Sequence, residues 1–222
     1  MRSEDPIRIP ERLSDQEKNN LETGESLPLM EAFYTVQGEG YHTGKAAYFI
    51  RIGGCDVGCH WCDVKESWDA GIHPPTPIKD IVDQALVHPS KTIVITGGEP
   101  LMWDLRPLCK ELKKHNFSIH IETSGAYPFQ GEFDWICLSP KRRKPPVKEA
   151  YKLAHELKVI VFNKQDFQWA EEHKAKLNRN SVLFLQPEWS VREKRMPEII
   201  EFVKENPDWM ISLQTHKYMH IP

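Results

Sequence analysis

The stretch FIRIGGCDVGCHWCD, residues 49–63, joins an apolar run to three closely spaced cysteines. Cys55, Cys59 and Cys62 follow the spacing C-x3-C-x2-C directly after that run. Iron–sulfur clusters are held by cysteine thiolates in short spaced runs of this kind. Three thiolates can ligate three irons of a [4Fe-4S] cluster, which leaves the fourth iron open to a chelating small molecule. The pattern therefore predicts a cluster-binding loop that comes directly after a strand.

Two other uses of these cysteines stay open. Together with His60 they offer tetrahedral zinc ligation, although structural zinc sites usually use two separated ligand pairs and the chain has no second C-x2-C. Disulfides are typical of oxidising compartments, and an odd count of 5 cysteines argues against them. Cys109 and Cys137 lie among apolar residues, where an inert buried thiol is the usual state.

Composition predicts a globular protein. The chain has 222 residues, of which 40% are hydrophobic and 27% charged, and this length permits one domain with a full core. A formal net charge of −3 indicates neither a nucleic-acid nor a membrane partner. We find no apolar stretch of transmembrane length and no secretory signal, so we expect a cytoplasmic protein.

The first 28 residues differ from the rest of the chain. They are polar, carry three prolines and show little periodicity. We therefore expect a loosely packed polar N-terminal extension over residues 1–28 and a single catalytic domain over residues 29–222.

Short apolar runs rich in β-branched and aromatic residues recur after Leu29, and each predicts a strand. The runs are AFYTV (32–36), AAYFIRI (46–52), TIVIT (92–96), SIHIE (118–122), WICLS (135–139), VIVF (159–162), VLFLQ (182–186) and WMISLQ (209–214). Helical periodicity lies between them, with apolar faces over residues 78–86, 105–112, 150–157 and 197–206. This alternation predicts an α/β fold with a parallel sheet covered by helices. About six such units are too few for a closed eight-stranded barrel, so we expect a curved, partly open one.

Glycines and polar residues stand after successive strands, where sheets of this kind carry their sites. They include Gly97–Pro100, Thr123–Gly125, Pro140–Lys141, Pro187–Glu188 and Thr215–Lys217. Glycines allow close approach of a ligand to the backbone, while Glu122 and Ser139 offer hydrogen-bond partners for ribose hydroxyls or an ammonium group. This set suits a ligand with adenosine and amino-acid parts, such as S-adenosylmethionine (SAM).

The cysteine spacing, with Trp61 before the last cysteine, resembles the radical SAM superfamily. Further motifs resemble the 7-carboxy-7-deazaguanine synthase family of queuosine and deazapurine biosynthesis, and the resemblance covers about Leu29 to Pro222. QGEG is the most family-specific motif, because radical SAM proteins in general lack it. The motifs are YTVQGEG (34–40), TGGEP (96–100), ETSGA (122–126), SPK (139–141), QPEW (186–189) and QTHKYMHIP (214–222).

This resemblance implies an incomplete (β/α)6-like radical SAM barrel, found as a homodimer. It implies cluster ligation by Cys55, Cys59 and Cys62. For SAM it implies contacts from Trp61, Asp63, Gly98, Glu99, Glu122, Ser139, Lys141 and Gln186. For the substrate it implies a pocket formed by Val36, Gln37, Gly38, Glu39, Arg51, Thr96 and the terminal carboxylate of Pro222.

The residue after Asp63 departs from the family pattern. The family often has Thr or Ser there, and its hydroxyl helps to bind a Mg²⁺ that also touches the substrate. This chain has Val64, which offers no oxygen to a hard cation. The metal is then absent, held by substrate and water, or replaced by a nearby group such as Lys65, which could supply positive charge to the substrate carboxylate. We expect a small change in metal dependence rather than a different reaction.

The reaction implied by the resemblance converts 6-carboxy-5,6,7,8-tetrahydropterin to 7-carboxy-7-deazaguanine with loss of ammonia. An electron from flavodoxin or ferredoxin starts it, a hydrogen is abstracted from C6 of the substrate, and SAM is regenerated. The protein's part is to position the reactants and exclude water and oxygen. Two alternatives are a radical SAM activase that acts on a partner protein and a non-catalytic zinc-binding module.

Overall fold

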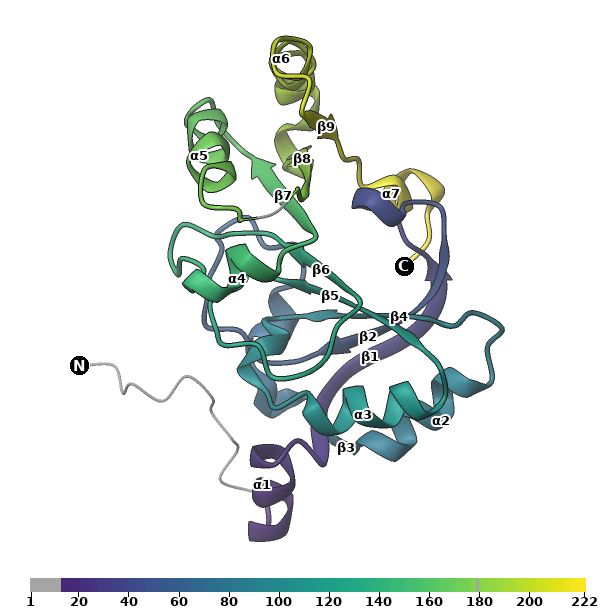
Figure 1. Cartoon of the computed structure of the whole chain (residues 1–222). Helices are drawn as coiled ribbons and strands as arrows, with labels where there is room; N and C mark the ends of the chain where they lie inside the picture. Colours follow the sequence, from purple (N-terminus) through teal and green to yellow (C-terminus); the bar gives the residue numbers. More distant parts are fainter. Residues whose placement is uncertain (1–12, 179) are drawn as a thin grey trace, which may run out of the picture.

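One curved, nine-stranded sheet organises the protein, and Figure 1 shows it without closure into a full barrel. The structure is a computed structural model that describes residues 13–178 and 180–222. The strand order is β3-β1-β2-β4-β5-β6-β7-β8-β9. The strands are β1 (Ser26–Val36), β2 (Ala46–Ile52), β3 (Pro75–Pro77), β4 (Thr92–Gly97), β5 (Ser118–Thr123), β6 (Trp135–Leu138), β7 (Glu156–Val161), β8 (Val182–Pro187) and β9 (Trp209–Ile211).

The predicted α/β fold with a partly open, mainly parallel sheet is confirmed. Strand β2 and strands β4 to β9 form one parallel series. Strand β1 differs, because it runs antiparallel to both β2 and the short edge strand β3, and this edge was not predicted from the sequence. The apolar residues of β4 show why the parallel strands are stable: Ile93, Val94 and Ile95 are all at most 1% exposed, so both faces of the sheet are covered.

Helices line the outer face of the sheet (Figure 1). Helices α2 and α3 pack on the first parallel strands, and α4, α5 and α6 pack beside the later ones. The helices are α1 (Asp15–Glu22), α2 (Ile78–Leu86), α3 (Arg106–Lys114), α4 (Lys148–Leu153), α5 (Gln165–Lys174), α6 (Arg192–Glu205) and α7 (Thr215–Met219). Five short 3-10 turns complete the described part: η1 (Gly40–His42), η2 (Lys65–Trp68), η3 (Ala70–Ile72), η4 (Pro100–Met102) and η5 (Trp189–Val191).

The loop after β1 reaches across the open side of the sheet to the segment after β9. The carbonyl oxygen of Gly38 accepts hydrogen bonds from Thr215 N and Thr215 Oγ1, both at 2.9 Å. Figure 1 shows α7 beside this loop, with the chain's C-terminal end next to it. Hydrogen bonds outside the strand ladder thus bring two distant parts of the sheet together.

Two elements differ from the sequence interpretation. The helical face expected over residues 150–157 ends early, because α4 stops at Leu153 and Leu157 lies inside β7. The run expected as a strand over residues 209–214 is shorter, since β9 ends at Ile211. Helix α5 was not predicted.

The expected polar extension is more ordered than predicted where the structure describes it. Ser14 caps α1 through a capping box with Glu17. Leu21 and Leu27 are 3% and 0% exposed and belong to the core, and the expected boundary at residue 28 falls inside β1. Residues 1–12 lie outside the described residues, so the prediction for them stays a prediction.

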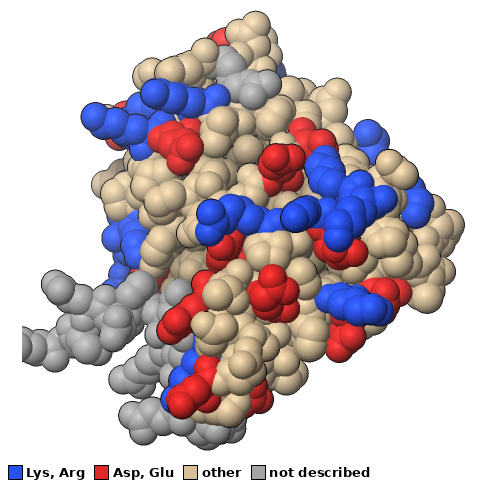
Figure 2. Space-filling model, turned by 60° about the horizontal axis from the view of Figure 1, so that its bottom comes forward, with Lys and Arg blue, Asp and Glu red and all other residues tan. Residues whose placement is uncertain are grey.

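No helix in the described ranges is long and apolar enough to cross a membrane. On the face drawn in Figure 2, Lys and Arg side chains lie among Asp and Glu side chains. This face therefore shows no extended surface of one sign.

Replacing Leu21 by Ala tests whether α1 is part of the fold. The side chain is only 3% exposed, so its loss leaves a cavity, and we expect the free energy of unfolding to fall by about 2–4 kcal/mol. Urea unfolding measures this. Val87→Ala is the control, because Val87 is 78% exposed and its truncation should cost less than about 0.5 kcal/mol. Equal effects of the two changes would show that α1 contributes nothing to the core.

Candidate active site

A cavity of about 280 Å³ opens at the carboxyl ends of the parallel strands. The structure brings every residue that the sequence motifs assign to a site to the wall of this cavity; the roles themselves stay predictions. These residues are Val36, Gln37, Gly38, Glu39, Arg51, Cys55, Cys59, Trp61, Cys62, Asp63, Thr96, Gly98, Glu99, Glu122, Ser139, Lys141, Gln186 and Pro222.

The cysteine loop is held by backbone hydrogen bonds to η2. Gly54 N donates to Ser67 O at 2.7 Å, and Cys55 N donates to Trp68 O at 3.1 Å. A turn then forms between the other two cysteines, with Cys62 N donating to Cys59 O at 3.1 Å. All three thiols are free and partly buried. Their side chains therefore reach the cavity from one short, well-anchored loop.

Burial favours the neutral form of the Cys55 and Cys59 thiols. It raises the pKa of Cys55 to about 11 and also raises the pKa of Cys59. Such thiols are neutral until a cation replaces their protons, as metal ligation does. Within residues 13–178 and 180–222, no three His, Cys, Asp or Glu side chains are placed to hold one metal ion. A [4Fe-4S] cluster requires a different arrangement from a single metal ion, since each cysteine ligates a different iron of the cluster.

Two glycines let the end of β4 lie against the cysteine loop. Gly98 N donates to Ile52 O, and Glu99 N donates to Gly54 O, both at 2.9 Å. A Cβ atom on Gly98 would lie 2.3 Å from Gly54 O, and Gly97 has a φ of 136° that L side chains rarely adopt. The TGGEP motif therefore serves close backbone packing between two loops of the site.

The carboxylate of Glu99 joins the ends of β4 and β5. It is 1% exposed and accepts hydrogen bonds from Thr123 Oγ1 at 2.5 Å, from Ser124 N at 2.8 Å and from Leu101 N at 3.1 Å. Ser124 Oγ also donates to it. The sequence resemblance implied a role for Glu99 in SAM binding, and the structure shows that it also organises two strand ends.

The SPK motif packs on the cysteine loop. Lys141 Nζ donates to Ser139 O at 2.6 Å and to Ser139 Oγ at 2.7 Å. It lies 5.7 Å from the centroid of the Trp61 ring, and burial lowers its pKa. An ammonium group and an aromatic face thus lie together next to the cysteines.

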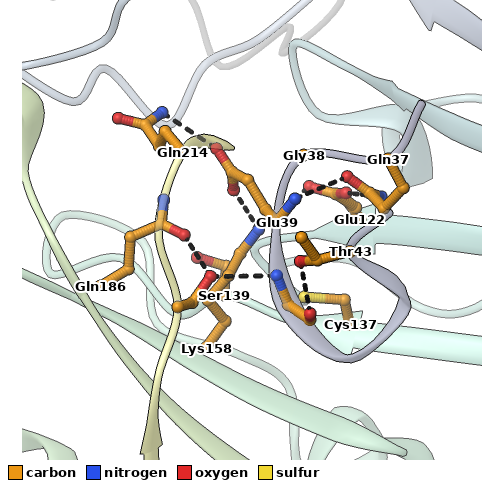
Figure 3. Close-up of polar contacts among 12 residues, drawn as sticks. Gln37, Gly38, Glu39, Thr43, Glu122, Cys137, Ser139, Lys158, Gln186 and Gln214 are labelled. Atoms are coloured by element: carbon orange, nitrogen blue, oxygen red, sulfur yellow. Dashed lines mark hydrogen bonds and ion pairs between the residues drawn. The ribbon is translucent and has the colours of Figure 1, made fainter. Parts of the chain in front are cut away.

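Lys158 forms the charged centre of the cavity, and it was not among the residues predicted from the sequence. Its ammonium lies 2.5 Å from Glu39 Oε2 and 3.2 Å from Glu122 Oε2 (Figure 3). Gln214 Nε2 donates to Glu39 Oε1, and Gln37 Nε2 donates to Glu122 Oε1, both at 2.9 Å. One feature of the sequence could have identified Lys158 as a site residue. It is a lysine inside the apolar run ELKVIV of β7, where a buried charge needs a partner of opposite charge.

Arg51 lies on β2 with its side chain 19% exposed. Its Nε is 2.9 Å from Glu31 Oε1 on β1, although this nitrogen has no hydrogen bond of good geometry. The guanidinium also lies 5.7 Å from the centroid of the Phe33 ring. The group is thus fixed at the cavity wall by one ion pair and one aromatic ring.

The residues after Cys62 contact the C-terminal helix. Asp63 Oδ2 accepts from Lys217 Nζ at 2.8 Å, and Lys217 also donates to Gln214 Oε1 at 3.1 Å. Val64 lines the cavity, whereas Lys65 is exposed and does not. The suggested role of Lys65 gains no support from this position.

His216 and the QGEG loop pack tightly against each other. A Cβ on Gly38 would lie 2.4 Å from His216 Nδ1, so only glycine fits at residue 38. Burial lowers the pKa of His216, which favours a neutral ring at the cavity wall. His216 and Glu188, two of the strand-end residues expected from the sequence, line the cavity. Trp189 also lines it and was not predicted as a site residue, although it stands in the QPEW motif.

Replacing Glu99 by Gln tests the link between β4 and β5. Every partner of this carboxylate is a donor, so the new amide group would face donors, and we expect a loss of about 2–3 kcal/mol in unfolding free energy. Urea unfolding measures it. Asp83→Asn is the control, because Asp83 forms only an exposed pair with Lys79 and should cost under about 0.5 kcal/mol. A neutral Glu99→Gln would mean that this carboxylate does not hold the strand ends.

Comparison with known proteins agrees with this geometry. A family model described as the radical SAM superfamily matches residues 49–136, which include the cysteine loop and the TGGEP motif. The chain is 30% identical to the protein in the crystal structure of QueE from Escherichia coli, with a TM-score of 0.75 over 90% of this chain and 99% of that one.

Curated relatives cover nearly the whole chain. A 7-carboxy-7-deazaguanine synthase from Flavobacterium psychrophilum is 64% identical over 91% of this chain and 96% of the relative. One from Synechocystis sp. is 48% identical over 88% of this chain and 94% of the relative. The alternatives of a protein activase and a zinc module are not favoured by these findings. With its three cysteines, its glycine-rich strand ends and its QGEG loop around one cavity, the chain belongs to the 7-carboxy-7-deazaguanine synthase family of radical SAM enzymes.

Proposed function

We propose that this protein converts 6-carboxy-5,6,7,8-tetrahydropterin to 7-carboxy-7-deazaguanine with loss of ammonia. The observation that carries the proposal is that the cysteine loop and the Glu39–Lys158–Glu122 centre open into the same cavity. The names of the relatives support it, because two of them, at 64% and 48% identity, are 7-carboxy-7-deazaguanine synthases.

The residues present fit a [4Fe-4S] cluster and SAM. When bound, these two groups supply the 5′-deoxyadenosyl radical that starts the chemistry. Cys55, Cys59 and Cys62 would hold the cluster, because they are the three thiols at one end of the cavity. For SAM we propose Trp61, Asp63, Gly98, Glu99, Glu122, Ser139, Lys141 and Gln186.

The substrate offers a flat ring with N–H donors and a carboxylate. Carboxylate acceptors and an arginine fork suit these two ends. Glu39 would accept from the ring, while the nitrogens of Arg51 that do not face Glu31 would bind the carboxylate. We propose that the remaining contacts come from Val36, Gln37, Gly38, Thr96 and Pro222.

Positioning and exclusion of water are the protein's own part in the reaction. The cavity is lined by residues of all seven sequence motifs, and the QGEG loop and α7 close the side that the sheet leaves open. A substrate held in this cavity lies at a fixed distance and orientation from the group that it reacts with. Such positioning supplies much of the rate advantage of an enclosed site.

The residues after the third cysteine do not fit a Mg²⁺ site. Val64 has no side-chain oxygen, and the carboxylate of Asp63 is bound by Lys217. Mg²⁺ takes oxygen ligands in near-ideal octahedral geometry. No step of the proposed reaction therefore uses it.

Three further properties rest on the family resemblance. We propose a homodimer, a flavodoxin or ferredoxin as electron donor, and a cytoplasmic location. A reducing compartment would keep the cluster thiols available, which supports the last of these.

Anaerobic incubation with SAM, dithionite and the carboxytetrahydropterin tests the function, with product detected by mass analysis. We expect a product that is lighter than the substrate by the mass of the ammonia that the ring contraction releases. Changing Cys55, Cys59 or Cys62 to Ala should abolish product and lower bound iron and sulfide, because each thiolate holds a separate iron.

Cys109→Ala and Cys137→Ala are the controls for cluster ligation, since both thiols are buried and neither lines the cavity. Both should retain iron, sulfide and SAM cleavage. Failure of the unaltered protein to form product would refute the function, and loss of the cluster in Cys109→Ala would refute the ligand set.

Varying Mg²⁺ in the same assay tests the loop at Val64. In the unaltered protein, turnover should change by less than about twofold, because no side-chain oxygen is available at this residue. Val64→Thr adds a hydroxyl and should respond more strongly. A strict Mg²⁺ requirement in the unaltered protein would show that other groups bind the metal.

A further inference from the structure

Lys158 is a buried lysine whose charge lies inside the cavity rather than on the surface. It points inward from β7, and its side chain is 4% exposed. Two carboxylates from different elements face it: Glu39 comes after β1, and Glu122 lies on β5. Figure 3 shows the ammonium between them. An ion pair with this degree of burial persists only if its partners satisfy it well.

The two carboxylates are arranged in the same way. Each has one oxygen toward Lys158, and the other accepts a hydrogen bond from an amide, Gln214 for Glu39 and Gln37 for Glu122. A carboxylate has about four acceptor sites, so each retains free lone pairs. The unit carries two negative charges and one positive charge.

The ammonium of Lys158 holds Glu39 in its ionised form. Burial alone would raise the pKa of Glu39, but the charge and hydrogen bond of Lys158 outweigh it and hold that pKa well below its usual range. Burial would likewise lower the pKa of Lys158, yet Glu122 and Glu39 raise it well above its usual range. Without this ammonium, the burial of Glu39 would favour its protonated form.

Neighbouring titratable groups do not replace Lys158. Burial raises the pKa of Glu156 and of the Cys137 thiol, and it lowers the pKa of His216. Lys141 is the other ammonium that lines the cavity, and it is bound to Ser139. The charged and titratable groups that face the unit are therefore Glu156, Cys137, His216 and Lys141.

We propose that Lys158 is a positioning residue that keeps Glu39 ionised and fixed beside Glu122, so that Glu39 accepts hydrogen bonds from the N–H groups of the substrate ring. This inference rests on the proposed function. Charge-assisted hydrogen bonds to a fixed carboxylate are strong in a site without water. A ring with a donor at this position would be selected over one that lacks it, because an unpaired buried carboxylate is costly.

Lys158→Met removes the charge and retains most of the volume. Burial then favours the protonated form of Glu39, so we expect the substrate affinity at pH 7 to fall about 100-fold and to recover as pH rises. In the unaltered protein the affinity should stay flat from about pH 6 to about pH 9, because Glu39 is ionised throughout. Equilibrium dialysis of the reduced pterin and of SAM, under anaerobic conditions, measures both affinities.

Lys158→Arg is the matched control, because it retains the positive charge. It should keep a flat pH profile even if its longer side chain weakens binding. SAM affinity should change less than about threefold in both variants, since the proposed role concerns the pterin. A flat profile in Lys158→Met, or an equal loss of SAM affinity, would overturn the proposal.

Lys158→Met/Glu122→Gln covers the case in which the single variant does not fold. It restores the net charge of the unit to one negative charge, so it should fold, but Glu39 lacks the ammonium. We expect pterin affinity at pH 7 at least about 10-fold below that of the unaltered protein. Affinity equal to the unaltered protein would refute the role of the ammonium. Product formation by the unaltered protein tests the function separately.

Discussion

The ion pair between Glu39 and Lys158 joins two parts of the protein that no strand pairing connects. Glu39 belongs to the loop after the antiparallel strand β1, and Lys158 lies on β7, several strands away in the sheet. An open sheet has no covalent or ladder connection across its gap. Here a buried charge pair, the amide of Gln214 and the backbone of Gly38 make that connection. The interior of the barrel is thus defined by polar contacts that face the same space a ligand would occupy.

The other wall of the cavity depends on backbone packing. Gly97 and Gly98 bring the end of β4 within hydrogen-bond distance of the cysteine loop, and Glu99 then binds the end of β5. Three loops are therefore fixed relative to one another by contacts within the protein itself. A cluster and SAM need such an arrangement, because a radical formed at a wrong distance from its target would react with the protein or with solvent.

Much of the site could be predicted from the sequence because its residues stand in short motifs directly after strands. The edge of the sheet could not, since the run AFYTV indicates a strand but carries no information about its direction. Residues 150–157 were misread because apolar residues at 150, 153, 154 and 157 fit a helix, while Leu157 is apolar for a different reason, as a core residue of β7. Lys158 was missed because its partners are 119 and 36 residues away in the chain, and only the fold shows them.

The packing of Gly38 against the segment around Thr215 and His216 has a consequence for how the protein folds. The hydrogen bond from Thr215 Oγ1 to Gly38 O closes a loop of 177 residues. Contacts of such high contact order form late, because the chain must lose the entropy of the whole loop before they contribute. During synthesis, this contact cannot form until residue 215 has been made, so the cavity wall at the QGEG loop depends on one of the last segments of the chain.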